Sequence, residues 1–425
     1  MQTFTSTEYL LIDIANNADE KLDKEVYAKR IEWTKGFADI QAMLDYASSK
    51  QWKSKPLFLK AVMALEEVAA GKPIGHLVGF DAASSGLQIN SVITSCWSGC
   101  TATGLVDQNR RANAYKDITE AQQNIMGSSG TADLKQIKNA AMTTAYGSDK
   151  EPEKIYGKGT DELAAFYEAM HEIVPGAMQV REESLNSWRP FATEQSWLMP
   201  DSCEVKVKNY SLVKSSIKVD ELQGSGFKYE YYENVGEERG KKNAANITHS
   251  IDSYILRSLV RYCNYSVKTV ATVEQILVDY VNDPATFTPT PAFESKANAS
   301  HEKFLNLQEC YEHSKVLDIC ILEHITEANV GFLSDEHIDK LRNAASSMLQ
   351  HKPFPIVTVH DDFKTHPNNL HDMRKHYNEI LANLCEGRLF ASILHDIADI
   401  DMPTTMPVGD RQLADVIRQA NYAIT

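Results

Sequence analysis

Two short apolar segments of this chain each run directly into an aspartate, and they constrain the fold more than any other feature. Residues 76–80 (HLVGF) lead to Asp81 and a run of small residues, and residues 353–359 (PFPIVTV) lead to Asp361. A buried strand holds a carboxylate rigidly at a sheet edge, so two such carboxylates that meet in space would form a two-metal site for Mg²⁺. No spacing rule links residues 280 positions apart. Taken singly, each aspartate is more often an ordinary strand-end residue that faces solvent.

A predicted helix over residues 138–147 (KNAAMTTAYG) places a lysine and a tyrosine on one face. Eight residues at 100° each bring Tyr146 to within about 80° of Lys138, two turns further on. The lysine would be a point charge for phosphate, and the tyrosine would contact a sugar or a base. The alternative is an exposed lysine beside a core tyrosine.

Three other groups carry weaker signals. His249 lies at a predicted helix start, where its ring would exchange a proton near neutral pH, although a lone histidine is more often structural. The pair His395-Asp396 resembles that of metal phosphohydrolases, but no second such set stands at a suitable spacing and the surrounding pattern is an amphipathic helix. Cys96 and Cys100 have no partner pair at zinc-finger spacing, so we expect buried thiols.

The remaining pattern alternates between helical and extended segments. Helical spacing covers residues 19–50, 58–70, 111–183 and 245–275. Residues 204–235 alternate on both sides of Gly224-Ser225-Gly226, which predicts a long β-hairpin. Residues 284–291 (PATFTPTP) predict a linker or a surface loop. A chain of 425 residues predicts two or three domains.

Charge and composition exclude some classes of protein. The chain has 43 basic and 58 acidic side chains, a net charge of −15. This balance argues against a surface that binds phosphate everywhere, but it allows a basic channel inside an acidic shell. We expect no signal peptide and no membrane span, because no basic leader and no apolar run of about 18 residues occurs. Seven scattered cysteines fit reduced thiols in a cytoplasm better than a disulfide framework.

In this order, the segments resemble motifs of the phage-type, T-seven-like single-subunit RNA polymerases. The family's strand and Asp-Gly-Ser-x-Ser-Gly-x-Gln are matched by residues 81–88 (DAASSGLQ). Its helix with Arg-x-x-x-Lys-x-x-x-Met-Thr-x-x-Tyr-Gly is matched by residues 134–147 (LKQIKNAAMTTAYG). Its Pro-Asn-x-x-His-Ser-x-Asp segment is similar to residues 246–252 (NITHSID), and its His-Asp-Ser-Phe to residues 360–363 (HDDF). Weaker resemblances around Asp23-Lys24, Tyr115, Trp197 and the C-terminal residues extend over nearly all of the chain.

The sequence departs from the family pattern in three places. Leu134 stands where the family has an arginine, with Lys135 one position away and rotated by about 100°. Residues 258–352 stand where the family has far fewer residues, which predicts an insertion. The thumb, the N-terminal promoter domain and an upstream Asp-x-x-Gly-Arg motif are absent from the sequence. We therefore expect a split enzyme that resembles the large subunit of the two-chain RNA polymerases of N-four-like phages.

The resemblance implies an α+β, right-hand polymerase fold that has a palm and helical fingers but lacks the N-terminal domain and the thumb. Residues 1–72 would form a helical module like the family's palm insertion, and residues 73–110 the first part of the palm. The fingers would be residues 111–248, with the β-hairpin near 204–235. Residues 249–425 would form the second part of the palm, with the insertion near 258–352 and the C-terminal segment.

The resemblance also implies template-directed addition of ribonucleotides with two Mg²⁺ ions, held by Asp81, Asp361 and the backbone carbonyl of Ala82. Lys138 and Tyr146 would be catalytic and would bind the nucleoside triphosphate, and Tyr146 would test the ribose 2′-hydroxyl. The other residues expected to bind the triphosphate are Gly147, His249, Tyr115 and Lys24. The residues expected to bind DNA are Lys206, Lys208, Lys214, Lys218 and Lys228.

The implied partners are a DNA template, an RNA product, nucleoside triphosphates and a second protein subunit that carries the missing N-terminal portion. A single-stranded-DNA-binding recruiter would be a further partner, and the implied location is the cytoplasm of an infected bacterial host. Two alternatives remain open at this point. One is a related family-A-like DNA polymerase, against which His249 in its Asn-x-x-His-Ser context speaks. The other is a non-catalytic DNA-binding subunit that has kept the shape of the site.

Overall fold

A three-stranded antiparallel sheet brings the two predicted strands together. The computed structural model describes residues 1–82, 84–127, 134–287, 299–399 and 408–425. Its central sheet has the order β1 (Val78–Asp81), β7 (Asp362–Thr365) and β6 (Val357–Val359). Asp362 on the middle strand lies opposite Asp81 on one side and Val359 on the other. Helices predominate and every strand pair is antiparallel, so the predicted α+β class is confirmed.

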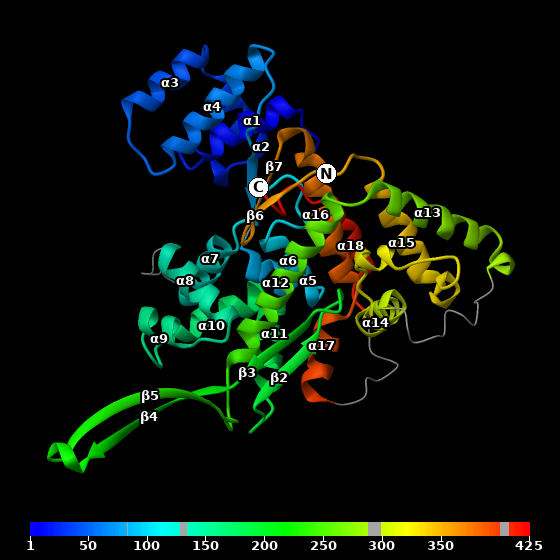
Figure 1. Cartoon of the computed structure of the whole chain (residues 1–425). Coiled ribbons are helices and arrows are strands. Elements are labelled where there is room, and N and C mark those ends of the chain that lie inside the picture. The colour runs from blue at the N-terminus through cyan, green and yellow to red at the C-terminus, as the bar shows by residue number, and fades with distance from the viewer. Residues whose placement is uncertain (83, 128–133, 288–298, 400–407) are drawn as a thin grey trace.

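The N-terminal segment forms a helical module that stands beside the sheet (Figure 1). Its elements are α1 (Ser6–Asn16), η1 (Leu22–Lys24), α2 (Tyr27–Lys35), α3 (Ile40–Ser49) and α4 (Lys55–Ala69). Thr5 and Glu8 form a capping box at the start of α1, and the side chain of Asp39 caps α3. A small core holds these helices together, made of Ile14, Met43, Ala47, Phe58, Ala61 and Val62.

A second group of helices lies mostly within residues 111–248, the range predicted for the fingers. After α5 (Ser85–Ile93) and α6 (Trp97–Ala102) come α7 (Ala114–Met126), α8 (Leu134–Ala145), α9 (Lys150–Tyr156), α10 (Asp161–Ile173) and α11 (Pro175–Asn186). Their shared core includes Ile118, Ile137, Phe166 and Met170. The buried side of α8 also carries Ala140, Ala141 and Ala145, small residues that let neighbouring helices approach closely.

The predicted hairpin over 204–235 is wrong in its first part. Strands β4 (Tyr210–Val219) and β5 (Ser225–Asn234) form a hairpin that projects from the body (Figure 1). Residues 204–208 form β3 (Glu204–Lys208), which pairs with β2 (Glu194–Leu198) instead. The break lies at Asn209, which is buried and donates from its backbone and its side chain to the carbonyls of Thr193 and Ala192. These bonds anchor the chain between the two sheets.

The C-terminal half is helical and includes the expected insertion. Its elements are α12 (Lys242–Cys263), α13 (Val267–Asn282), η3 (Pro284–Thr286), α14 (Ala299–Ser314), η5 (Ile319–Glu323), η6 (Val330–Phe332), α15 (Asp335–Met348), η7 (Pro367–Asn369), α16 (Leu370–Glu386), α17 (Leu389–Ala398) and α18 (Arg411–Arg418). Leu277, Phe304 and Leu341 of the insertion belong to the same buried cluster as Phe80 and Phe363 of the sheet. The insertion is therefore packed into the main core. Of the predicted loop 284–291, residues 288–291 lie outside the described residues.

The structure also bears on the expectations for His249, for the pair His395-Asp396, for the cysteines and for membrane spans. His249 does not lie at a helix start, because α12 begins at Lys242 and places it two turns further on. His395 and Asp396 lie on helix α17, as predicted. All seven cysteines are free; Cys100 is buried and Cys96 half-buried. Of the helices that the structure describes, none has the length and apolar character of a membrane span.

Candidate functional site: a cleft between the central sheet, helices α7 and α8, and the N-terminal module

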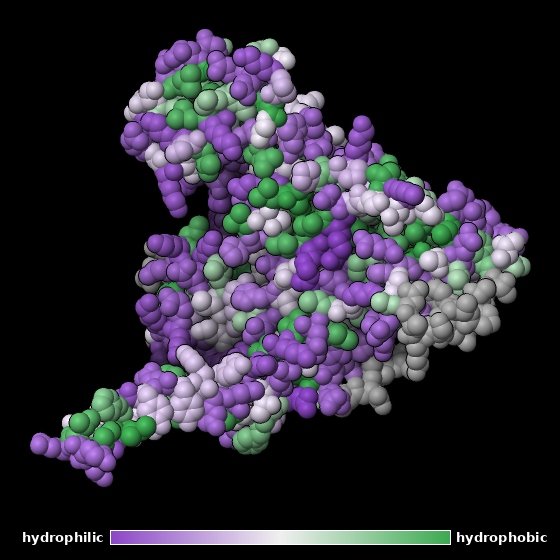
Figure 2. All heavy atoms as spheres, viewed as in Figure 1, coloured by the Kyte–Doolittle hydropathy of each residue, from purple (hydrophilic) through white to green (hydrophobic). Residues whose placement is uncertain are grey.

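A cleft of about 930 Å³ collects half of the predicted site residues. It is lined by parts of the N-terminal module, by the edge of the sheet and by helices α7 and α8. Figure 2 shows the hollow between the N-terminal module and the helices below it. The predicted site residues that line it are Lys24, Asp81, Ala82, Tyr115, Lys138, Tyr146 and Asp361. Segments that are far apart in the chain thus contribute to one site.

The backbone fixes the two aspartates next to each other. The N–H of Ala82 donates to the carbonyl oxygen of Asp361 over 3.1 Å. Asp361 lies in the two-residue turn between β6 and β7, where His360 takes a left-handed conformation with φ of 56°. On the other side, the N–H of Thr425 donates to the carbonyl oxygen of Asp81 over 3.0 Å. Both aspartates are therefore carried by hydrogen-bonded backbone.

Negative charge is concentrated at this edge. Partial burial, together with the charges of Asp361 and Asp362, raises the pKa of Asp81 to about 6, although Lys24 and Lys138 act in the opposite direction. Asp252 on α12 also has a raised pKa, because of burial and the charge of Asp361. Carboxylates that repel one another are suited to a divalent cation, which would relieve the repulsion.

The donor set fits Mg²⁺ better than a transition metal. Asp81 and Asp361 offer hard carboxylate oxygens, and Ala82 is buried beside them. Among the described residues, no group of three or more His, Cys, Asp or Glu side chains is placed to hold a metal ion. Mg²⁺ usually takes one or two protein carboxylates and completes its shell with water and substrate phosphates, so a pair of aspartates is a donor set that fits it.

The raised pKa of Asp81 leads to a prediction about stability. A carboxyl whose pKa in the folded protein lies above its ordinary value of 3.8 destabilises the fold once it is ionised, and the cost grows as the pH rises from about 4 to 6. We expect Asp81→Asn to raise the melting temperature of the metal-free protein by about 2 °C at pH 8 and by much less at pH 4.5. Thermal unfolding at the two pH values measures this.

Asp149 provides a control, because its substitution should change the melting temperature in the opposite direction. Burial opposes its ionisation, but hydrogen bonds and charges from Lys241 and Arg181 prevail and lower its pKa. Asp149→Asn should therefore lower the melting temperature at pH 8. A stabilising effect of Asp81→Asn that is equally large at pH 4.5 would contradict the proposed repulsion among the carboxylates.

Lys138 and Tyr146 face the same cleft from helix α8. The ammonium of Lys138 lies 5.7 Å from the ring centroid of Tyr115. Tyr146 directly follows the last turn of α8, and its ring centroid lies 5.0 Å from that of His249. Burial, with a contribution from Asp252, raises the pKa of Tyr146 to about 12, so its hydroxyl stays protonated and can donate. His249 thus does not line the cleft itself but contacts Tyr146, which does.

A glycine in the small-residue turn makes room for this tyrosine. A Cβ at Gly86 would lie 2.6 Å from the hydroxyl oxygen of Tyr146, closer than any side chain tolerates. Gly86 follows the first residue of α5, immediately after the turn that leads from Asp81. Gly86 therefore has a steric reason: it leaves room for the Tyr146 side chain in the cleft.

The cleft is basic although the protein is acidic. Seven basic side chains line it against five acidic ones, a surplus of two positive charges, whereas the chain as a whole has a net charge of −15. Lys135 and Leu134 both line the cleft, so Lys135 faces the same space as Lys138. The basic residues are Lys21, Lys24, Lys60, Arg111, Lys135, Lys138 and Lys364. A basic cleft of this kind favours a polyanionic ligand.

Sequence reasoning missed several residues of the cleft. Arg111 lines it, and burial lowers the pKa of its guanidinium although the charges of Tyr27, Asp23 and Asp81 act in the opposite direction. It belongs to no motif and lies three residues before the start of α7. Arg30 is fully buried and donates to the carbonyls of Asp23 and Glu25, which positions the segment that carries Lys24.

Some expected site residues lie elsewhere. Gly147 is buried and closes α8 with φ of 85°, and a Cβ there would lie 3.0 Å from that of Ala244, so its role is in packing. Lys206 and Lys208 lie on β3. The strand register places Lys214, Lys218 and Lys228 on one face of the projecting hairpin. Residues 210–234 contain four acidic residues beside these three lysines, so the hairpin has no surplus of positive charge.

Comparison with known proteins adds no family to this picture. No family model matches the sequence, and no curated protein matches it.

Proposed function

We propose that this chain is the catalytic subunit of a DNA-directed RNA polymerase. The observation that carries the proposal is the convergence, in one basic cleft, of Asp81 and Asp361 with Lys138 and Tyr146. The aspartates come from positions 280 residues apart, and a backbone hydrogen bond from Ala82, the neighbour of Asp81, to Asp361 holds the two segments together. Each residue alone has an ordinary structural explanation, but their meeting in a cleft with surplus positive charge is what template-directed nucleotide addition requires.

In the proposed reaction, the 3′-hydroxyl of the growing RNA attacks the α-phosphorus of a nucleoside triphosphate. A new oxygen–phosphorus bond forms while the hydroxyl proton passes to solvent water, the bond to the bridging oxygen of the β-phosphate breaks, and pyrophosphate leaves with the electron pair. Asp81 and Asp361, with the carbonyl of Ala82, would hold two Mg²⁺ ions, which lower the pKa of the attacking hydroxyl and neutralise the leaving group. The role of the protein is to hold the reacting groups in line.

The remaining residues of the cleft would bind the substrate. Lys138, with Lys24 on the opposite wall, supplies positive charge for the triphosphate. Tyr146, supported by His249, would contact the sugar, because a ribose 2′-hydroxyl both donates and accepts hydrogen bonds that deoxyribose lacks. Tyr115 lies beneath Lys138 and would fix the lysine through its ring.

The proposed partners follow from the resemblance of the sequence. They are a DNA template, the RNA product, nucleoside triphosphates, a second subunit with the missing N-terminal portion, and a single-stranded-DNA-binding recruiter. The proposed location is the cytoplasm of an infected bacterium. The hairpin lysines Lys214, Lys218 and Lys228 remain predicted DNA contacts, and Lys214 is already paired with Glu230 at 2.8 Å.

A primer-extension assay separates this proposal from its rivals. The chain, alone and together with a chain that co-purifies with it, is incubated with primed template, Mg²⁺ and either ribonucleotides or deoxyribonucleotides. We expect extension with ribonucleotides, and we expect Tyr146→Phe to reduce the preference over deoxyribonucleotides by about tenfold, since one hydrogen bond is removed. The ratio of kcat/KM for the two substrates measures this.

The alternatives give different results in the same assay. A DNA polymerase would prefer deoxyribonucleotides. A non-catalytic subunit would bind primed template without extending it under any combination. Tyr167→Phe is a suitable control, because it removes a tyrosine hydroxyl that bonds to Asp149 outside the cleft, and it should leave the preference unchanged.

A further inference from the structure

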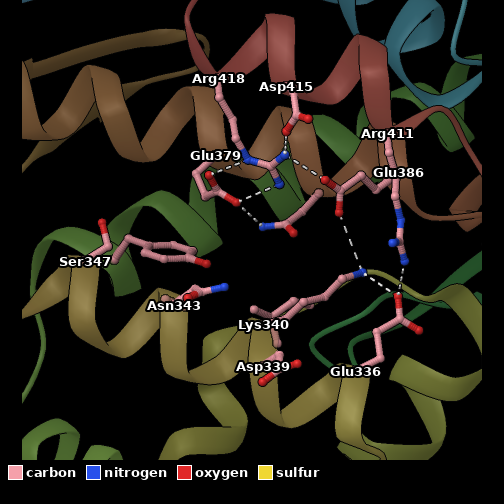
Figure 3. A pocket seen from close by; sticks show the side chains of 14 residues that line it. Glu336, Asp339, Lys340, Asn343, Ser347, Glu379, Glu386, Arg411, Asp415 and Arg418 are labelled. Carbon is pink, nitrogen blue, oxygen red and sulfur yellow. Dashed lines mark hydrogen bonds and ion pairs between the residues drawn. The ribbon is translucent and has the colours of Figure 1, made fainter.

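A second pocket, of about 690 Å³, lies between the insertion and the C-terminal helices. Its walls come from α15, α16 and α18, with Tyr262 of α12 and Leu317 at one side. No residue that lines it also lines the catalytic cleft. Figure 3 shows that charged side chains from the three helices point toward one another across it.

The walls carry more negative than positive charge. Five carboxylates face three cationic side chains, a surplus of two negative charges. The carboxylates are Glu336, Asp339, Glu379, Glu386 and Asp415. They are distributed over all three helices, so negative charge surrounds the space instead of occupying one side of it.

The cationic side chains are already engaged with these carboxylates. Arg418 donates twice to Glu379, over 3.0 and 3.1 Å, and its Nη1 also contacts Glu386 at 2.7 Å and Asp415 at 2.9 Å. Arg411 contacts Glu336 at 3.1 Å. An anion would therefore have to compete with three carboxylates for Arg418 and with one for Arg411, which argues against a phosphate or nucleotide ligand.

A buried hydroxyl on the pocket wall has no partner. Tyr262 is only 1% exposed, its ring stacks on His376 at 5.1 Å, and its hydroxyl oxygen forms no hydrogen bond with any residue that the structure describes. A buried hydroxyl without a partner is unfavourable, and native proteins rarely contain one without a reason. The side chains of Asn343, Ser347 and Asn383 add further polar groups to the same wall.

We propose that this pocket binds aliphatic ammonium groups, as found in a small polyamine or in the lysine side chains of a partner protein. An ammonium group donates three hydrogen bonds, which suits carboxylates on several walls and a hydroxyl oxygen that can accept. The volume is in the range of small-molecule sites. A bound polycation would connect α15 of the insertion with α18, whose continuation reaches Ala82 through the bridge with Ile424.

Isothermal titration of the full chain with spermidine tests this proposal. We expect saturable binding with one site per chain, about tenfold weaker in Tyr262→Phe. This substitution keeps the net charge, so general attraction of a polycation to an acidic protein cannot produce the difference. Ser258→Ala is the matched control, because Ser258 is a buried hydroxyl without a partner among the described residues, one turn earlier on α12 and outside the pocket.

The two sources of ammonium are distinguished by titration with a short oligolysine peptide. Tighter binding of spermidine supports a free polyamine, and tighter binding of the peptide supports lysine side chains of a partner. Equal affinity of the wild type and Tyr262→Phe for both probes would overturn the proposal, as would the absence of binding. Thermal unfolding without ligand should be unchanged in Tyr262→Phe, since its hydroxyl has no partner to lose.

Discussion

Asp361→Asn abolishes ribonucleotide addition in the proposed mechanism, with a loss of at least about a thousandfold in the single-turnover rate. The substitution keeps the size of the side chain but removes a negative charge and a hard oxygen ligand. The backbone carbonyl that accepts from Ala82 is unaffected, so the turn between β6 and β7 should keep its conformation. The loss would therefore be chemical and not structural.

The neighbouring residue supplies a matched control. Asp362→Asn makes the same chemical change one position further on, at a carboxylate that also faces the cleft but is paired with Lys364 at 2.8 Å. We expect its rate to fall by less than about tenfold, because its charge acts on Asp81 only through space. Equal losses in both variants would remove the assignment of Asp361 as a metal ligand.

Measurements of folding and of template binding complete this experiment. Circular dichroism and DNA binding of Asp361→Asn should match those of the wild type, which separates a loss of chemistry from a loss of structure. Extension by Asp361→Asn at a rate within tenfold of the wild type would refute the two-carboxylate mechanism. Extension that is lost together with DNA binding would instead point to a damaged fold.

The local parts of the site were predictable because each depends on a short stretch of sequence. The strand that ends at Asp81 follows from a continuous apolar run and the small residues after it. The shared face of Lys138 and Tyr146 follows from helical spacing, and both residues do line one cleft. The approach of Asp361 to Asp81 was only a hypothesis, because it depends on strand pairing across 280 residues that no local pattern encodes.

Other features depend on long-range contacts and were missed or misread. The alternating pattern of residues 204–235 predicts extended structure but not which strands pair, so β3 was assigned to the wrong sheet. Arg111 has no motif, and only the fold brings it to the carboxylates. The acidic composition hides the basic cleft, since a surplus of two charges in one place has little effect on a total of −15. Likewise, only the fold shows that Tyr262 lies in the wall of a pocket.

Lys138→Ala should reduce kcat/KM for the incoming nucleoside triphosphate by about 100-fold, while Lys135→Ala reduces it by about tenfold or less. A charged hydrogen bond to phosphate in a partly enclosed site contributes about 1.5–3 kcal/mol. The charge of Lys138 is among the main influences that lower the pKa of Asp81, and that of Lys135 is not.

The two lysine variants also test which residue replaces the arginine that phage-type RNA polymerases have at the position matched by Leu134. Both lysines line the cleft from α8, about one turn apart, so both can reach a ligand bound there. If Lys135 takes over the role of the missing arginine, its loss should raise KM and leave kcat nearly unchanged, as expected for binding that is equal in the ground state and the transition state. Lys138→Arg should recover part of the activity, because it restores the charge. Equal effects of the two alanine variants on kcat would show that the cleft acts as a diffuse positive field, and the specific role of Lys138 would then be withdrawn.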